Sequence, residues 1–407
     1  MGLFDFLFPK KEQRSSNNFL DSFGIASSGV PVSEKGAMQL TAVWSAVNLI
    51  SSTIASLPLN VYTRDKRGSK QIAYNSPLQN LLHNIPSENY TSYQFRNTMM
   101  CHLLLYGNAY AIIERNGGGR PVSFKIVEPE YVEVTVGADG KSYYTIQNED
   151  KVYQSKEMLH FVGLSYDGVK GKSPISACRE ALGVGLATQK FGAKFFENGA
   201  ILSGVLQTDG KLTEESAQRL RTSWNNRFGG VYKSHSTAVL EGGVNYKPIS
   251  VPLVDAEFVK NRSFTIAEIA RIFRVQPHMI MDLERSTNNN IEQQSIEFVT
   301  YTLMPYLVNI EQEFNRKIFS PNEQKNSYVK FMVSGLLRAD VDSRGDYYRR
   351  LFEIGVLSAN EIREFEDLNR VEGLDEHYVP LNLGEAGKNN TETNGWYLWW
   401  LSSIGSK

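Results

Sequence analysis

The chain has 407 residues, of which 41% are hydrophobic and 21% charged, and its formal net charge at pH 7 is -1. This composition is typical of a globular protein with a sizeable core, and it excludes a wholly disordered chain, a collagen and a disulfide scaffold. Proteins that bind nucleic acid chiefly by charge carry a basic excess, because neutralisation of phosphates supplies most of their affinity. The near-neutral charge therefore excludes a strongly basic DNA-binding protein, while DNA could still slide past a few placed side chains.

Residues 1–37 are predicted to form an extended N-terminal arm, because Ser, Asn and Gly are frequent in it. The first residues, Met1 to Lys11, are too few for a signal peptide and carry their charges on the wrong side. Phe6 stands where a myristoylation signal needs Ser or Thr. No apolar run approaches the ~20 residues of a membrane span, so we expect a soluble intracellular protein without a membrane partner.

Residues 38–172 are predicted to form an α+β domain. Val43, Val47 and Ile50 recur at helical spacing, and Pro58 ends that helix. Short apolar runs separated by turn residues then predict several strands. The elements expected after Pro58 are strands at 59–62, 109–114, 122–136, 143–147 and 158–162, a short helix from Ser76-Pro77, and a helix at 93–105.

A first long helix is predicted within residues 173–200, at about 174–198. Ser173 suits the cap position and Pro174 the first turn. The helix also contains three glycines, which each cost helix stability. Close contact with another helix in an assembly is expected to compensate for Gly183, Gly185 and Gly192.

Residues 201–250 are predicted to form a compact β-α-β-β insert, and a second long helix follows within 251–282, at about 255–274. In the insert, Thr213 is the candidate helix cap. The expected strands of the insert are 203–207, 237–240 and 244–249, with a turn at Glu241-Gly242-Gly243.

The remainder of the chain begins with a polar segment, 283–290, that has no periodicity. By itself it is typical of an ordinary surface loop, although a mobile loop projecting into a channel is the alternative. Residues 291–339 are predicted to hold a long helix at 291–318, kinked at Pro305, and a strand at 328–332. Residues 340–384 are predicted to hold two short helices, at 347–352 and 358–368. A flexible tail, 385–407, with aromatic residues from Trp396 to Leu401, ends the chain.

Nucleotide and thiol chemistry are not indicated. Gly171-Lys172-Ser173 is similar to the end of a phosphate-binding P-loop, but Tyr166 stands where that motif needs glycine. Ser173 is explained instead as a helix cap. Cys101 and Cys178 are far apart in apolar stretches, so we expect two buried free thiols.

The histidines form neither an HxxxH nor an HExxH pair, and no Cys/His cluster is present. His102 and His160 lie in apolar stretches and are expected to be core residues with satisfied hydrogen bonds. No spaced carboxylate cluster resembles a two-metal nuclease site. We therefore predict no catalytic residue, no cofactor and no metal site.

Several segments, in their order and spacing, resemble the portal proteins of tailed phages, in the HK97-like portal family. The resemblance covers roughly residues 25–380. The segments are Ala42–Ile50 followed by Leu57-Pro58-Leu59, Tyr106–Tyr110, Gly171–Ile175, Phe195–Ala200, and Ile269–Phe273 followed by Pro277.

The resemblance implies an α+β portal fold assembled into a cyclic ring. It implies a wing, a two-helix stem, a small α/β clip, a loop facing a tunnel and a helical crown. On this sequence these are the wing at 38–172 with 291–339 returning to it, the stem at 173–200 and 251–282, the clip at 201–250, the tunnel loop at 283–290 and the crown at 340–384.

The resemblance also implies a function. The ring, of about twelve copies, would occupy one capsid vertex of the virion, after assembly in the host cytoplasm, and would conduct DNA during packaging and ejection. The implied partners are other copies of the chain, the terminase large subunit, the head-to-tail connector, the major capsid protein and scaffold, and double-stranded DNA in the tunnel.

The implied site residues lie in three of these regions. The DNA-facing tunnel loop would be Glu284, Arg285, Ser286, Thr287, Asn288, Asn289 and Asn290. The stem residues would be Lys260, Arg262, Glu268 and Arg271, and the clip residues Trp224, Arg227 and Phe228. Because Glu284 partly cancels the field of Arg285, we expect a tunnel of mixed charge that lets DNA move.

Two alternatives remain open. A DNA-processing enzyme, either a metal-dependent nuclease or a P-loop enzyme, would bind metal or nucleotide and turn over substrate. A scaffold or adaptor could form a ring without conducting DNA, and it would not need the tunnel loop.

Overall fold

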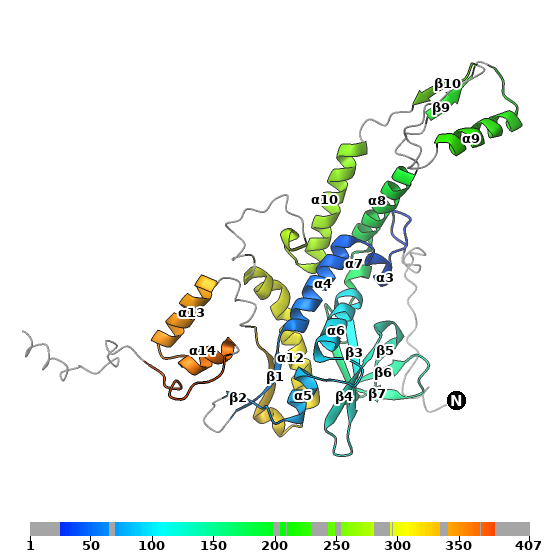
Figure 1. Cartoon of the computed structure of the whole chain (residues 1–407). Helices are drawn as coiled ribbons and strands as arrows, with labels where there is room; N and C mark the ends of the chain where they lie inside the picture. Colours follow the sequence, from blue (N-terminus) through cyan, green and yellow to red (C-terminus); the bar gives the residue numbers. More distant parts are fainter. Residues whose placement is uncertain are drawn as a thin grey trace, which may run out of the picture. The chain divides into compact units, whose positions relative to one another are not determined.

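The computed structural model of the chain is drawn in Figure 1. The residues that it describes are 25–64, 70–197, 204–208, 210–228, 243–248, 254–280, 294, 296–333, 341–366 and 368–378. The chain divides into two compact units, Met1–Val333 and Ser334–Lys407.

Helices of the first unit form where the periodicity predicts them. α4 (Thr41–Ser56) buries Val43, Ile50 and Ile54 completely, and it contacts α6 (Ser92–Tyr106). The side chains of Thr91 and Gln94 cap the start of α6 reciprocally, and its end is closed by a glycine in the left-handed region. The other short helices before residue 160 are α3 (Glu34–Ala37), α5 (Pro77–His83), and the 3-10 turns η1 (Pro129–Tyr131) and η2 (Ser155–Glu157).

The described strands pair in antiparallel sheets of order β11-β1-β2, β4-β3-β8, β5-β6-β7 and β10-β9. Their bounds are β1 Leu59–Arg64, β2 Lys70–Ile72, β3 Asn108–Arg115, β4 Pro121–Val127, β5 Val132–Val136, β6 Ser142–Ile146, β7 Val152–Gln154, β8 Met158–Val162, β9 Gly204–Gln207, β10 Asn245–Pro248 and β11 Ser327–Phe331. The predicted strands near 59, 109, 143, 158 and 328 are confirmed. The strand expected at 122–136 is two strands, because the turn η1 separates β4 from β5.

The pairing of β11 with β1 joins distant parts of the chain, since Leu59 lies opposite Phe331. Tyr62 and Tyr328 stack across this pair, with ring centroids 5.5 Å apart. Cross-strand aromatic pairs of this kind stabilise a register. The first sheet is therefore completed by residues that follow the whole of the 173–296 region.

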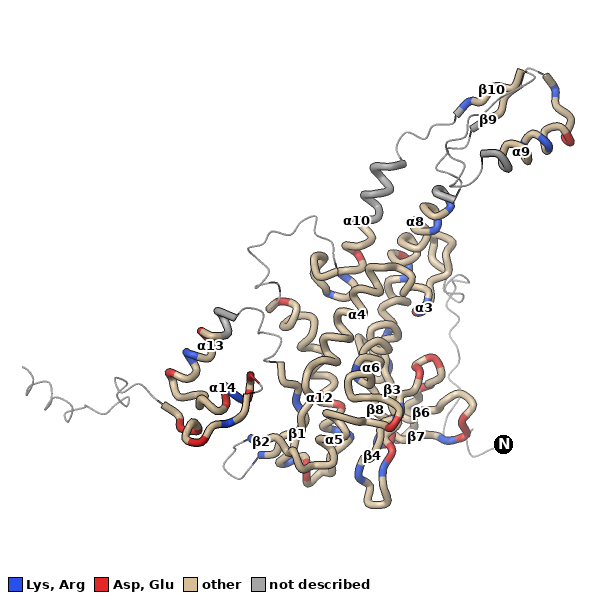
Figure 2. The backbone as a smooth tube through the Cα atoms, viewed as in Figure 1, with Lys and Arg blue, Asp and Glu red and all other residues tan. Residues whose placement is uncertain are grey.

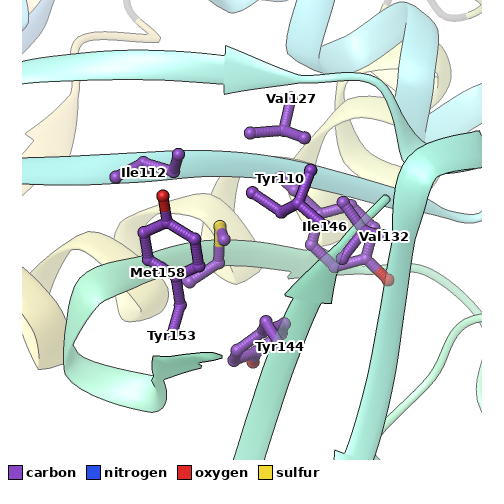
Figure 3. Packing of buried hydrophobic residues seen from close by; sticks show 8 residues of the cluster. All are labelled: Tyr110, Ile112, Val127, Val132, Tyr144, Ile146, Tyr153 and Met158. Carbon is purple, nitrogen blue, oxygen red and sulfur yellow. The ribbon is translucent and has the colours of Figure 1, made fainter. Parts of the chain in front are cut away.

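Both faces of β3 are covered, which explains its nearly continuous apolar sequence. Alternate residues of a strand point to opposite faces. On one face, a cluster joins β3 and β4 to the sheet β5-β6-β7 (Figure 3). Its buried members are Tyr110, Ile112, Val127, Val132, Tyr144, Ile146, Tyr153 and Met158. Phe314 of α12 (Met304–Ile318) lies against Phe124 of β4 and Phe161 of β8, at ring-centroid distances of 5.7 and 5.6 Å.

The prediction of one uninterrupted helix at 174–198 is wrong. Cys178, with φ -106° and ψ 26°, separates α7 (Pro174–Ala177) from α8 (Arg179–Glu197). No proline or glycine marks this break in the sequence. Ser173 caps α7 as predicted, because its side chain accepts a hydrogen bond from the backbone N–H of Ser176.

Cys178 and Cys101 are free thiols, as predicted, but they are half-buried rather than buried.

The glycines of α8 make their close contacts within the chain. A Cβ atom on Gly183 would lie 2.3 Å from the Cβ of Ala26. A Cβ on Gly185 would lie 2.7 Å from Thr265 of α10 (Val254–Phe273). These two glycines therefore allow the arm and α10 to approach α8 within one copy of the chain, and the expected contact between copies stays a prediction. Gly192 also lies on α8 and is buried.

The insert is described in part, as β9, β10 and α9 (Glu214–Phe228). Thr213 caps α9, since its hydroxyl accepts from the backbone N–H of Ser216 at 3.3 Å. β10 pairs with β9. The strand expected at 237–240 lies outside the described residues.

The chain around Pro305 is helical as predicted, but it is not α-helical throughout. A π-helical segment, Phe298–Leu303, comes directly before α12, and Pro305 lies in the first turn of α12. Proline has no N–H to donate, and its ring would collide with the carbonyl four residues earlier in an α-helix. The wider π turn resolves both problems. The 3-10 turns η4 (Pro277–Ile280) and η7 (Glu323–Lys325) flank this region in sequence.

The second unit contains the predicted helical pair, α13 (Val341–Glu353) and α14 (Ala359–Phe365). Ser358 and Glu361 cap α14 reciprocally. Gly355, with φ 71°, turns the chain between the two helices. The buried Asn360 then holds the segment after α14, because it bonds both the N–H and the carbonyl of Val371. The aromatic tail at 385–407 lies outside the described residues.

Candidate functional site

The residues expected to face a tunnel, Glu284 to Asn290, lie outside the described residues. Lys260 and Arg262 lie on α10, but their side chains are also outside the described part. The same holds for Arg227 and Phe228 on α9. The stem pair Glu268 and Arg271 and the clip residue Trp224 are described in full.

Glu268 and Arg271 interact with each other, one turn apart on α10. The Arg271 guanidinium donates a hydrogen bond to the Glu268 carboxylate. Arg271 is 67% exposed, so the pair adds little to stability. This helix surface presents a locally neutral ion pair rather than an isolated positive charge.

Trp224 connects the helix of the insert to its hairpin. Its ring stacks on Tyr246 of β10, with centroids 5.1 Å apart and planes 22° apart. Such a stacked pair contributes about 0.5–1.5 kcal/mol beyond area burial. The contact makes Trp224 an internal packing residue of the insert.

The start of α7 is held against the end of α6 by a glycine junction formed by Gly107, Gly163 and Gly171. Gly107 has φ 71°, and a Cβ there would lie 2.1 Å from the carbonyl oxygen of Lys172. A Cβ on Gly171 would lie 1.9 Å from the carbonyl oxygen of Gly107. The backbone N–H of Gly163 donates to that same carbonyl at 2.8 Å. Backbone therefore packs directly on backbone, and only glycine fits.

Asn108 fixes the junction from the side. Its Oδ1 accepts from the N–H of Gly171 at 2.8 Å, and its Nδ2 donates to the carbonyl of Gly171, also at 2.8 Å. The hydroxyl of Ser173 donates to the carbonyl of Leu105, at the end of α6, at 2.8 Å. Two of the segments that carry the resemblance, 106–110 and 171–175, thus lie in contact, and their contacts fix the position of the first residues of α7.

A buried polar network lies beneath this junction. His160 of β8 is 5% exposed, and its Nε2 bonds the Oδ1 of Asn108 at 3.0 Å. Because that oxygen can only accept, Nε2 carries the proton, and Nδ1 accepts from the Tyr144 hydroxyl at 3.3 Å. His160 is thus the satisfied core residue that was predicted. His102 is not, because its buried Nδ1 has no hydrogen-bond partner among the described residues.

The network ends in a buried ion pair on α12. Lys317 and Glu313 have side chains 4% and 6% exposed, and their Nζ and Oε1 atoms are 3.3 Å apart. Lys317 also donates to the carbonyl of Met158 at 2.9 Å, and Glu313 accepts from the backbone N–H of His160 at 3.0 Å. Both charges are therefore paired and hydrogen-bonded, which buried charges require. Burial nevertheless lowers the pKa of Lys317.

Burial, with smaller contributions from the charges of Lys317 and Arg316, lowers the pKa of His160 to about 3. An unfolded chain would protonate this imidazole near pH 6.5. Between these two values the unfolded state binds a proton that the folded state does not. The free energy of unfolding is therefore fully retained above about pH 6.5 and falls as the pH decreases, by up to ~1.4 kcal/mol per pH unit.

Replacing His160 with glutamine should flatten this pH dependence. Glutamine can still donate to Asn108 but does not titrate. We expect urea unfolding of the wild type to lose stability more steeply than H160Q between about pH 6 and pH 4. Parallel curves for the two proteins would show that His160 does not carry the effect.

Charges of both signs are interspersed along the described chain (Figure 2). Among the described residues, no group of three or more His, Cys, Asp and Glu side chains could hold a metal ion. In the same part of the chain, no helix is long and apolar enough to cross a membrane.

Sequence reasoning missed the network of Asn108, His160, Glu313 and Lys317. The i,i+4 spacing of Glu313 and Lys317 was a signal, but it is equally typical of an exposed helix surface. The segments around Gly107 and Gly171 were noticed, although not as partners of one another.

Comparison with known proteins gives a consistent result. A family model described as phage portal protein matches residues 41–367. The probable portal protein of Streptomyces phage phiC31 is 33% identical over 380 residues, covering 89% of this chain and 82% of that protein. The portal protein of Enterobacteria phage HK97 is 32% identical over 373 residues, covering 89% and 87%.

Solved structures share the fold. A chain in the neck of an empty gene transfer agent particle, computed with C6 symmetry, matches with a TM-score of 0.59 and 22% identity, over 83% of this chain and 94% of that chain. The crystal structure of an HK97 family phage portal protein from Corynebacterium diphtheriae matches with a TM-score of 0.55 and 17% identity, over 76% and 98%.

Proposed function

The chain belongs to the phage portal protein family, and from this premise we propose that about twelve copies close into a ring that conducts DNA into and out of a capsid. The match over residues 41–367 carries this proposal. A related structure, the neck of a native gene transfer agent particle, was computed with C12 symmetry, which supports the copy number.

In this proposal α8 and α10 form the stem that lines the conduit, and the glycine junction fixes where the stem begins. The wing would comprise 38–172 with 291–339, and the crown 340–384. Closure into a ring needs two different, complementary faces on each copy. The expected partners are other copies, terminase, the connector, the capsid protein with its scaffold, and DNA.

The chain is proposed to have no enzymatic activity of its own. ATP hydrolysis would belong to the terminase motor docked on the clip. Gly171-Lys172-Ser173 forms the glycine junction and a helix cap, which supports a structural role for these residues. Clear ATP turnover, or metal-dependent nuclease activity, by the purified protein would favour the enzyme alternative instead.

Negative-stain electron microscopy of the purified protein tests the ring. We expect end-on class averages with about a dozen lobes around a hole of DNA width, as in a closed cyclic assembly. A compact dimer with a cleft would contradict the proposal.

Deletion of Thr287 to Asn290 tests the tunnel loop. The ring should still assemble, because the helices on either side of the loop are retained, while DNA packaging or retention should fall. The readouts are particle images and the amount of DNA in filled capsids. Unchanged packaging would remove the loop from the DNA path and would favour the scaffold alternative.

Trp224→Ala tests the clip. Loss of the stack on Tyr246 should destabilise α9 by about 2 kcal/mol, seen as faster amide hydrogen exchange there, and terminase docking should be lost. Trp224→Phe, which keeps an aromatic ring, serves as the control. Retained docking in Trp224→Ala would show that this contact does not shape the terminase surface.

A further inference from the structure

A cavity lies where the turn between β3 and β4 approaches the end of α12 (Figure 1). The cavity has a volume of about 900 Å³. Its cationic lining residues come from the β3–β4 hairpin, from η2 and from the last turn of α12, and they are Arg115, Arg120, Lys156, Arg316 and Lys317. This is a local excess of positive charge in a chain whose net charge is -1.

Part of this charge has a structural explanation. Arg316 and Lys317 lie in the last turn of α12, where cations complement the helix dipole. Arg115 donates to the carbonyl of Lys317 at 2.6 Å and to the carbonyl of Gly119 at 2.9 Å. These contacts hold the cavity wall in place. They give Arg115, Arg316 and Lys317, the inner cations of the cavity, a structural role.

Arg120 and Lys156 are different. Both are exposed, and neither side chain forms an ion pair or hydrogen bond with any described residue. They come from separate elements, so no single helix terminus explains them. Two unpaired cations therefore stand at a cavity where two of the inner cations, Arg316 and Lys317, are paired with Glu313.

The carboxylates of the cavity are already occupied. Glu157 pairs with Lys151 at 3.1 Å and accepts from the backbone N–H of Gln154 at 2.9 Å. Glu323 accepts from the backbone N–H and hydroxyl of Ser320, at 2.9 and 2.6 Å. Neither carboxylate forms an ion pair or hydrogen bond with Lys156 or Arg120, although the charge of Lys156 contributes to the lowered pKa of Glu157 and that of Arg120 to the lowered pKa of Glu323.

The remaining lining residues are partly apolar, with Pro77, Leu78, Pro121 and Pro321, and partly polar, with Ser76, Ser320 and Gln324. Duplex DNA is a wide rod that binds along extended basic surfaces, and it does not enter a cavity of this size. A flexible segment with carboxylates beside aliphatic side chains matches both kinds of lining. Charge complementarity across such a contact gives specificity and fast association.

We propose that this cavity is a docking site for an acidic peptide segment of a partner protein, with Arg120 and Lys156 binding its carboxylates and the proline-lined wall receiving an aliphatic residue. The lining of this cavity includes no residue of α8 or α10, the helices proposed to line the conduit, so peptide binding would not depend on whether the ring conducts DNA.

The test is fluorescence anisotropy with a short fluorescein-labelled peptide of glutamates around a central leucine pair. The full chain and the double variant R120E/K156E are compared. The matched control is K70E/K125E, which changes the net charge equally at exposed positions on β2 and β4 that do not line the cavity. Thermal melts establish that all three proteins are folded.

We expect saturable binding by the wild type, weakened ~10-fold or more in R120E/K156E and within about twofold of wild type in the control. Equal weakening in both variants would reveal a general charge effect and overturn the site. Absence of saturable binding to the wild type would overturn it as well. If duplex DNA or inorganic phosphate displaced the peptide at lower concentration than unlabelled peptide, the assignment to a peptide partner would be wrong.

Discussion

Gly107→Ala should lower the free energy of unfolding by about 3 kcal/mol or more, because two penalties coincide at one residue. A residue with a Cβ at φ 71° costs roughly 1–2 kcal/mol. The new Cβ would also lie 2.1 Å from the carbonyl oxygen of Lys172, so the backbone of the junction must move apart. Urea unfolding followed by circular dichroism measures the loss.

The chain contains a matched control for this variant. Gly119 has φ 78°, but nothing lies within 4 Å of a Cβ built there. Gly119→Ala should therefore lower the free energy of unfolding only by the cost of the left-handed backbone conformation, about 1 kcal/mol. If both variants lost the same amount of unfolding free energy, the 171–173 backbone would move away from residue 107 at little cost, and the junction would not be tightly packed.

Lys317→Met should lower the free energy of unfolding by about 3–5 kcal/mol, because it leaves the carboxylate of Glu313 buried without its buried partner. Methionine keeps most of the side-chain volume, so little of the loss comes from a cavity. Chemical unfolding measures the effect. Adding Glu313→Gln to Lys317→Met should restore part of the stability, since the unpaired charge is then removed.

The control for this second variant is Lys151→Met. Lys151 pairs with Glu157 at 3.1 Å but is 57% exposed, and such pairs contribute about 0–1 kcal/mol. If Lys317→Met were no more destabilising than Lys151→Met, Arg316 alone would be sufficient to satisfy Glu313.

Local sequence signals predicted most of the helices and strands. The sequence did not predict which residues far apart in the chain contact each other. The helix at Thr41–Ser56 follows from its apolar spacing and Pro58, and Ser173 was identified as a cap from its neighbour Pro174. β2 and β7 have three residues each, which is too short to show an alternating pattern.

The candidate site was less predictable than the fold. Asn108 and Gly171 are 63 positions apart, and nothing local to either one indicates that they form hydrogen bonds. Pro305 indicated a disturbance of the helix, but only the structure shows that the disturbance is a π-helical segment directly before α12. The family resemblance suggested which regions matter and could not state which side chains meet.

Because β1 pairs with β11, the chain that follows β2 leaves the sheet β11-β1-β2 and returns to that same sheet at β11. The entropy of closing such a loop grows only with the logarithm of its length, at about 0.6 kcal/mol per doubling. Residues can therefore be added to or removed from the insert at 201–250 with little change in the free energy of forming the sheet. The length of the insert can thus change while the sheet that carries it keeps its pairing.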